Sequence, residues 1–302
     1  MPADAAAGLD WTFRAMGADW RLHHSGGVDG ATAQAVAEAV AADEALWSRF
    51  LPGSDVTRVN RAAGRAVAVA PATFDLIAAA VAWTERTGGL FQPLQGAQLV
   101  RWGYRGGVGD GAPACAPPAA RVPAGPIELN AALRTVRIPS GTALDLGGIG
   151  KSAAAVRAGA LLAERSDDPR LIVDAGGDLA IIRGDHRVAT AAGAVLARAG
   201  TGVATSSSER RAWVLGDGTP AHHLIDPRTG APGARGTAVV CDVDPVAADV
   251  LASCAVLEPA LVATLDAAVA RIDVAGATLR SPRWAAVAAP GLSGSSHGGT
   301  AD

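Results

Sequence analysis

The sequence TALDLGGIGKS, at residues 142–152, carries the most informative pattern in the chain. Its apolar beginning predicts a strand over 142–146, and the glycines after it predict a tight turn that opens a helix over 151–164. A glycine-rich turn exposes backbone N–H groups, and the helix dipole favours negative charge at that end. The stretch therefore predicts a binding site for a phosphate or pyrophosphate.

Two common nucleotide-binding motifs nearly fit this stretch. Walker A requires a glycine five positions before the Gly150–Lys151 pair, and Asp145 occupies that position. Residues 148–153 satisfy the loose dinucleotide fingerprint, but they lie in mid-chain without clear flanking βαβ units. An aspartate facing phosphates would repel them unless a cation intervened. The pattern thus predicts a phosphate site with a cation close by.

Lys151 strengthens this interpretation. The chain has 26 Lys and Arg residues, and Lys151 is its only lysine. A composition so biased towards arginine indicates that this position requires a compact ammonium group. A lysine at a helix start is also acceptable without any function, but here it coincides with the glycines.

Asp249 and Ser253 are candidate metal ligands. They lie four residues apart in a helix predicted over 246–257, so both oxygens occupy one helix face. Hard oxygen ligands suit Mg²⁺, which often bridges to substrate phosphates. Taken alone, this spacing fits a solvated aspartate and a helical serine without any metal. The predicted anion site upstream, which needs a cation, favours the metal interpretation.

The segment HHLIDPRTG, at residues 222–230, is the second concentration of polar chemistry. Its PRTG end is typical of a turn, and a histidine beside it can act as a general base. The alternative is a structural histidine bonded to the turn. No further Cys or His lies at zinc-ligand spacing, and no G-x-S-x-G serine-hydrolase motif occurs.

Composition excludes several classes of protein. The net charge is −3 and the basic residues are dispersed, so no nucleic-acid partner is expected. No stretch of about 20 apolar residues could span a membrane. The first ten residues lack the features of a secretory signal, and three cysteines without a C-x-x-C pair indicate reduced thiols. These features predict a cytoplasmic protein.

The chain mixes helices and strands without strict βαβ alternation, which favours the α+β class. Apolar spacing predicts helices over 31–47, from Pro71 to the glycines at 88–89, and over 260–271. Further strands are predicted at 171–173, 179–182, 212–215 and 236–241. Gly and Pro predict a mobile insertion near 105–126, and the polar stretch 291–302 predicts a disordered tail.

Nine segments, taken in order, resemble the FAD:protein FMN transferase family, and the likeness covers residues 11–290 as one domain. The segments are MG at 16–17, WSRFLPGSDVTRVN at 47–60, TGGLFQP at 87–93, RWG at 101–103, LDLGGIGK at 144–151, DAGGD at 174–178, VATS at 203–206, HHLIDPRTG at 222–230 and AD at 248–249.

The resemblance implies a single two-lobed α+β domain of mixed or antiparallel sheets, with packed helices around a central FAD cleft. FAD would be the substrate, and Mg²⁺ the cofactor, held by the Gly148 carbonyl, Asp249 and Ser253. His223 and Lys151 would be catalytic. The flavin nucleotide would contact Met16, Phe50, Leu90, Phe91, Gln92, Asp145 and Lys151.

The implied reaction transfers FMN from FAD to a threonine or serine hydroxyl of an acceptor protein and releases AMP. The same residues would serve an FAD pyrophosphatase, in which water replaces the hydroxyl, and a flavin-binding module without turnover is the other alternative. This sequence departs from the family at several positions, among them Val156 and Arg157, near which the family often carries an Asp. The family usually has Asp where this chain has Gln92, and Gly where it has Ser152 and Ser207. It has Thr where this chain has Ser253.

Overall fold

The computed structural model describes residues 9–105, 113–117, 121 and 125–289 of the 302-residue chain. The predicted tail at 291–302 lies outside these residues, as does part of the predicted insertion at 105–126. The described positions of that insertion form no helix or strand before β4 (Glu128–Asn130).

The largest element of the described fold is an antiparallel sheet of eight strands, in the order β1-β2-β6-β7-β10-β15-β16-β17. The strands are β1 (Leu9–Ala15), β2 (Ala18–His24), β6 (Leu171–Ala175), β7 (Leu179–Arg183), β10 (Gly202–Ser207), β15 (Thr237–Val243), β16 (Ala268–Ile272) and β17 (Thr278–Arg280). The first hairpin joins the rest of the sheet where β2 pairs with β6, with Trp20 opposite Ala175.

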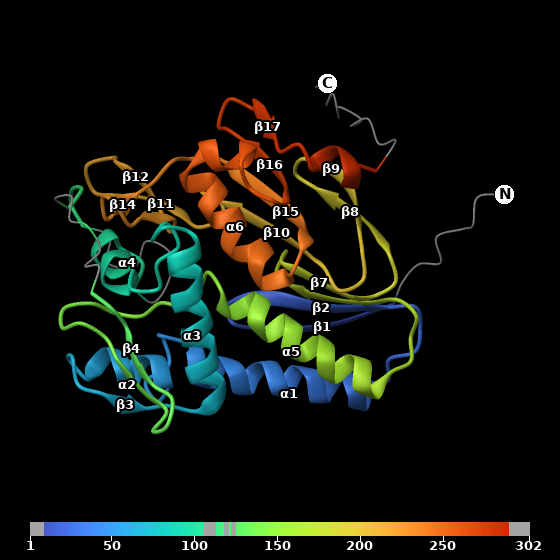
Figure 1. The fold of residues 1–302 in the computed structure, drawn as a ribbon, viewed down its shortest axis with the longest axis horizontal. Helices are drawn as coiled ribbons and strands as arrows, with labels where there is room; N and C mark the ends of the chain where they lie inside the picture. Colours follow the sequence, from blue (N-terminus) through green and yellow to red (C-terminus); the bar gives the residue numbers. More distant parts are fainter. Residues whose placement is uncertain (1–8, 106–112, 118–120, 122–124, 290–302) are drawn as a thin grey trace, which may run out of the picture.

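Three helices cover one face of this sheet: α1 (Gly30–Trp47), α5 (Gly150–Arg165) and α6 (Pro245–Leu257) (Figure 1). The α5 helix lies on β6 and β7, and α6 lies on β10 and β15. Close approach is possible because β10 begins with Gly202, where a Cβ atom would come 2.4 Å from the backbone of Pro245. The glycine thus fixes how near the first turn of α6 lies to the sheet.

A hairpin and a short helix cover part of the other face. They are β8 (His186–Thr190), β9 (Gly193–Ala197) and α7 (Trp284–Val287). Val195 and Trp284 pack there against Ile181, Val239 and Ala270 of the sheet. Strands β7, β15 and β16 are therefore apolar on both faces.

A smaller group of elements lies beside the helix-covered face (Figure 1). It contains α2 (Asp55–Arg61), α3 (Pro71–Arg86), α4 (Gly96–Trp102) and the small sheet β3-β5-β4, whose other strands are β3 (Val67–Ala68) and β5 (Thr135–Arg137). Two small hairpins adjoin it: β11 (Ala212–Val214) with β12 (Pro220–His222), and β13 (Ile225–Asp226) with β14 (Ala231–Pro232).

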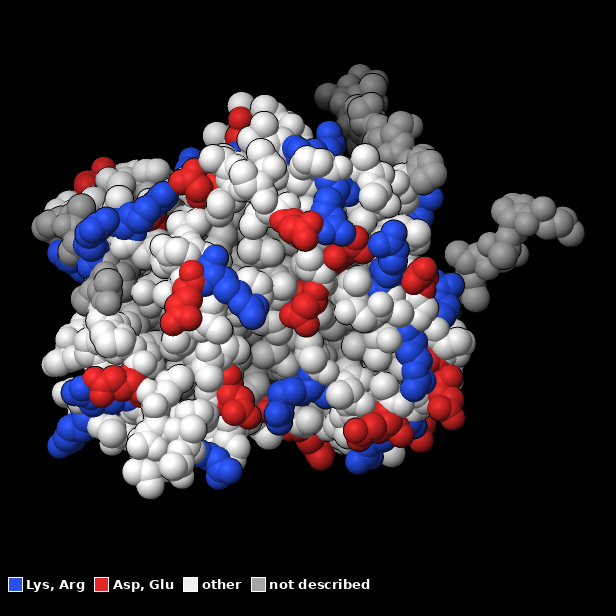
Figure 2. Space-filling model, viewed as in Figure 1, with Lys and Arg blue, Asp and Glu red and all other residues white. Residues whose placement is uncertain are grey.

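Two tryptophans tie these hairpins to α4. The Trp102 indole donates to the carbonyl of Gly230 at 2.8 Å, and the Trp213 indole donates to the carbonyl of Trp102 at 2.8 Å. The architecture confirms the predicted α+β class. In the described part of the chain, no helix is long and apolar enough to cross a membrane. Figure 2 shows acidic and basic side chains interspersed over the face it presents.

Most predicted helices and strands are confirmed, with two exceptions. Residues 142–146 form no strand; only Ala143 bridges to Gln95. The Asn60 side chain satisfies both backbone groups of Leu144, at 2.6 and 3.0 Å, so this backbone needs no ladder partner.

The second wrong prediction is the helix over 260–271. Its beginning is a short 3-10 turn, Pro259–Ala263, and its end is β16, which is buried between β15 and β17. A short apolar run such as this one has the same pattern in a buried strand as in a buried helix.

Candidate functional site

A cleft of about 590 Å³ opens between the helix-covered face of the large sheet and the smaller group of elements. Its walls come from the β1–β2 turn, the segment before α4, the loop before α5, the β6–β7 turn, the end of β10, the segment after β12, and α6. Nine of the predicted site residues line it: Leu90, Phe91, Gln92, Asp145, Gly148, Lys151, His223, Asp249 and Ser253.

The glycine-rich loop forms one wall and leads directly into α5. The N–H of Gly150 donates to the carbonyl of Leu146 at 2.7 Å, which closes the turn. A Cβ atom on Gly148 would lie 3.4 Å from the Phe91 ring, so the glycine lets the ring approach the loop. No side chain of the described residues caps this helix start. An uncapped helix start of this kind favours an anion at its backbone N–H groups.

Lys151 is half-buried at the start of α5 and forms an ion pair with Asp178 in the β6–β7 turn. Burial alone would lower the pKa of the ammonium group, but the carboxylates of Asp178 and Asp249 outweigh burial and raise it. Lys151 is therefore a permanent cation in the wall of the cleft.

Asp249 lies buried on α6, and its Oδ2 accepts a hydrogen bond from the Ser152 hydroxyl at 3.0 Å. Burial, and next the charge of Asp178, raise the pKa of the Asp249 carboxyl to about 7, while Lys151 acts in the opposite direction. A buried carboxylate without its own ion pair is costly unless a cation approaches it. This environment fits a bound metal ion.

The neighbouring donors also fit a hard cation. Ser253 lies one turn further along α6, with its hydroxyl 2.8 Å from that of Ser206, and Gly148 lines the same cleft. A carboxylate, a hydroxyl and a backbone carbonyl form the oxygen set that Mg²⁺ prefers. Within the described residues, no group of three or more His, Cys, Asp or Glu side chains could hold a metal. The ion would therefore rely on neutral oxygens and on substrate phosphates.

His223 follows β12 and lines the cleft, whereas its neighbour His222 does not. Nδ1 of His223 is buried and has no hydrogen-bond partner within the described structure. Burial, and then the charge of Arg211, lower the pKa of this imidazole to about 3, so it is neutral near pH 7. His222 instead has its Nε2 3.2 Å from the carbonyl oxygen of Gly233.

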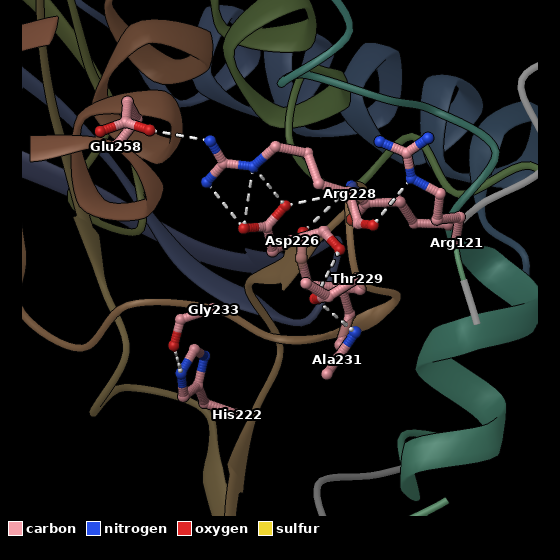
Figure 3. A network of polar contacts seen from close by, with 10 residues as sticks. Arg121, His222, Asp226, Arg228, Thr229, Ala231, Gly233 and Glu258 are labelled. Atoms are coloured by element: carbon pink, nitrogen blue, oxygen red, sulfur yellow. Dashed lines mark hydrogen bonds and ion pairs between the residues drawn. The ribbon is translucent and has the colours of Figure 1, made fainter. Parts of the chain in front are cut away.

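A network of ion pairs holds the turn after His223 against α6 (Figure 3). The Arg228 guanidinium binds both carboxylate oxygens of Asp226, with its Nη2 2.7 Å from Oδ2, and its Nη1 donates to Glu258 at 2.8 Å. Glu258 directly follows α6, the helix that carries Asp249. The PRTG turn thus fixes the position of the predicted base relative to the predicted metal ligands.

Asp145 is paired with a cation from within the chain, the guanidinium of Arg49. Nε of Arg49 lies 2.5 Å from Oδ2 of Asp145, and the same guanidinium sits 4.2 Å above the Phe50 ring. Arg49 belongs to the WSRF segment at 47–50, but nothing in the neighbouring sequence indicates that its partner is Asp145, 96 residues away.

Met16 and Phe50 lie beside the cleft and not among its lining residues. Met16 occupies the β1–β2 turn with a left-handed φ of 51°, and the next residue, Gly17, does line the cleft. Phe50 is 45% exposed and packs edge-on against the cleft residue Tyr104.

Sequence reasoning assigned no role to a set of charged cleft residues. Some of the acidic residues belong to the DAGGD segment at 174–178, which the sequence linked only to the family resemblance. The basic residues belong to no recognised motif. This set comprises Arg14, Asp19, Arg21, Asp174, Asp178, Arg210 and Arg211.

Comparisons with known proteins identify the family and the fold of the chain. A family model described as the ApbE family matches residues 16–270. The ApbE protein of Thermotoga maritima superposes with a TM-score of 0.80 at 26% identity, over 92% of this chain and 98% of that one. The search of curated proteins gave no match.

Two further solved structures share the fold. The apo flavinyl transferase ApbE of Pseudomonas stutzeri has a TM-score of 0.79 at 19% identity and covers 94% of this chain and 98% of its own. The flavin transferase ApbE of Vibrio cholerae has a TM-score of 0.73 at 16% identity, over 93% and 99%.

Proposed function

Because this chain belongs to the ApbE family, we propose that it is a flavin transferase that moves FMN from FAD to a threonine or serine hydroxyl of an acceptor protein and releases AMP. The observation that carries the proposal is the meeting of Lys151, Asp249 and His223 in one cleft. These residues come from three separate segments and supply a cation, a buried carboxylate and a neutral base. The catalytic unit is residues 11–290, which encloses the family match.

The cleft suits a flavin nucleotide in size and in lining. Its volume of about 590 Å³ lies within the usual range of small-molecule sites. Leu90, Phe91 and Tyr104 offer apolar and aromatic surface to the flavin ring, and Arg49 stacks beside them on Phe50. The pyrophosphate would lie at the glycine loop, where Lys151 and the first turn of α5 compensate its charge.

The Gly148 carbonyl, Asp249 and Ser253 would hold Mg²⁺, which supplies Lewis-acid neutralisation of phosphate charge when bound. Lys151 adds a fixed ammonium beside that site, held in place by Asp178. Asp249 is in turn oriented by Ser152, so the cationic side of the cleft is built before substrate arrives.

His223 accepts the proton of the acceptor hydroxyl in this proposal. Its low pKa keeps the imidazole neutral near pH 7, the form in which a ring nitrogen can accept a proton. The hydroxyl oxygen forms a bond to the FMN phosphorus, the bond from that phosphorus to the AMP oxygen breaks, and AMP leaves with the electron pair. Holding the oxygen in line supplies much of the rate.

The decisive experiment incubates the protein with FAD, Mg²⁺ and a recombinant candidate acceptor protein. Intact mass should show one FMN added to the acceptor, with an equal amount of AMP. An acceptor variant that lacks the target hydroxyl is the control and should gain no mass. AMP release without acceptor would identify an FAD pyrophosphatase instead, and FAD binding without any AMP would identify a flavin-binding module.

The proposal places the reaction in the cytoplasm. Cys115, Cys241 and Cys254 are all free thiols, which suits a reducing compartment. Cell fractionation followed by detection of the native protein tests this location, and recovery with an extracytoplasmic fraction would contradict it.

A further inference from the structure

Arg211 and His223 each lie one residue beyond the ribbon formed by β11 and β12, directly opposite each other at its end. The register pairs Ala212 with His222, and the N–H of His223 donates to the carbonyl of Arg211 at 3.2 Å, one pair further along. Residues directly opposite each other on antiparallel strands project from the same face of the ribbon. Arg211 and His223 therefore share a face, and both line the cleft.

The Arg211 guanidinium is half-buried and carries no compensating partner. Elsewhere on the cleft wall, Arg14 pairs with Asp19 and Arg210 donates to the Gly176 carbonyl. Within the described residues, the side chain of Arg211 makes no hydrogen bond and no ion pair. A guanidinium without a partner, in the same cleft as the Lys151 ammonium, is available to an anionic group of a ligand.

The electrostatic influence of Arg211 reaches all three proposed functional groups. After burial, it is the largest cause that lowers the pKa of His223. Its charge also acts on the pKa values of Lys151 and Asp249, behind burial and the neighbouring carboxylates. The geometry agrees, because Arg211 lines the same cleft as His223, Lys151 and Asp249.

We infer that Arg211 is a further substrate-binding and catalytic residue, whose guanidinium binds the FMN phosphate of the flavin nucleotide, the group under attack in the transfer. This inference rests on the proposed function. Arginine suits the role because its planar fork donates to two phosphate oxygens at once. Lys151 and Arg211 would then hold the phosphate from two sides, with His223 next to the face where the acceptor hydroxyl arrives.

The step remains balanced with Arg211 in this role. The acceptor oxygen bonds to the phosphorus, the proton of its hydroxyl passes to His223, and AMP departs with the electrons of the broken bond. Arg211 is unchanged throughout and stabilises negative charge on the non-bridging oxygens as the transition state forms.

Binding of FMN and riboflavin tests the inference without requiring turnover, because riboflavin lacks the phosphate. The variants are Arg211→Gln, Arg211→Lys and the control Arg280→Gln, which removes an exposed guanidinium on β17 away from the cleft. Titration by flavin fluorescence should show Arg211→Gln binding FMN roughly 10-fold more weakly, with unchanged riboflavin affinity. Arg211→Lys should fall between, and Arg280→Gln should match the parent protein.

Unchanged FMN affinity in Arg211→Gln would overturn the inference, and so would an equal loss for FMN and riboflavin, which would indicate a role in folding or in flavin stacking. Turnover of FAD with an acceptor is measured in parallel, where Arg211→Gln should lose about 10²-fold or more in kcat. If the parent protein bound FAD yet released no AMP, the proposed function would be wrong. The comparison of FMN and riboflavin affinities would still test whether Arg211 binds the phosphate.

Discussion

The hydroxyl of Ser152 donates a hydrogen bond to Oδ2 of Asp249 across 3.0 Å and so joins the first turn of α5 to the middle of α6. The two residues are 97 positions apart in the chain. The bond orients the buried carboxylate that we propose as the magnesium ligand. Ser152 thus has a defined task directly after the glycine-rich loop.

Ser152→Ala should weaken Mg²⁺ binding about 10-fold, as the loss of an outer-shell partner typically does. The substitution keeps a good helix former at the start of α5, so the melting temperature without metal should change little. Calorimetric titration of Mg²⁺ in the presence of FAD gives the affinity. Equal affinity in the variant and the parent would show that the Ser152 contact does not support a metal site.

Asp249→Ala should abolish Mg²⁺-stimulated AMP release, because it removes the only charged member of the proposed ligand set. Ser253→Thr should preserve activity, since threonine supplies the same hydroxyl, and Ser253→Ala should lose less than Asp249→Ala because water can replace a neutral ligand. Initial rates over a range of Mg²⁺ concentrations distinguish these variants. Full metal-dependent activity in Asp249→Ala would disprove the metal assignment.

Lys151→Arg should lose at least about 10-fold in kcat although the charge is kept. The lysine side chain is only 16% exposed and pairs with Asp178, and a larger planar guanidinium cannot occupy that compact site without displacing its neighbours. Steady-state kinetics with FAD provide the measurement. Kinetics equal to those of the parent protein would mean that the chain's only lysine serves no specific purpose.

His223→Ala should keep FAD binding and lose about 10²- to 10⁴-fold in transfer rate, the usual effect of removing a general base. His222→Ala is the matched control. Its ring faces Gly233 on the other side of the ribbon, so rate should change little even if stability falls. Affinity, melting temperature and transfer rate are measured for both. Similar rate losses in the two variants would reject His223 as the base.

Asp168 should stabilise the protein in a pH-dependent way that has no connection with the cleft. Burial raises the pKa of its carboxyl, but hydrogen bonds from Ser25, Arg170 and Gly27 outweigh burial and lower it to about 2. A depressed pKa means that the stabilisation is fully present above the unfolded value near 3.8 and is lost as pH falls through about 2.

Asp168→Asn should therefore cost about 2 kcal/mol of unfolding free energy at pH 7, and the difference from the parent should shrink near pH 2. Urea denaturation at both pH values measures it. Asp75→Asn, at an exposed position on α3, is the control and should change little. A difference that stayed constant with pH would show that ionisation of Asp168 is not the cause.

Local sequence patterns predicted the elements and residues whose chemistry is local. The glycine turn before Lys151 and the four-residue spacing of Asp249 and Ser253 depend on neighbours within one or two helical turns. By contrast, the Arg49–Asp145 pair joins residues 96 positions apart, and no period or spacing encodes it. Arg211 was missed for the same reason: only the register of β11 with β12 places it opposite His223.

The two wrong elements have physical causes of the same kind. The strand predicted at 142–146 lost its ladder because a distant asparagine side chain satisfied the backbone of Leu144. The end of the helix predicted over 260–271 is β16, because a position in the sheet between β15 and β17 buries its apolar run. Tertiary partners decided both outcomes.

The pairing of β2 with β6 also has a consequence for the order in which the chain acquires its structure. Trp20 faces Ala175 across that pair, so the first hairpin can join the large sheet only after residue 175 has been synthesised. At typical rates of about 5–20 residues per second, this interval lasts roughly 8–30 s. During that time the hairpin has an unpaired edge and an uncovered apolar face, including Trp20 and Leu22, which are fully buried in the folded protein. The nascent chain thus exposes this hairpin to misassociation until residue 175 has been translated, and binding of chaperones during synthesis should concentrate in that interval.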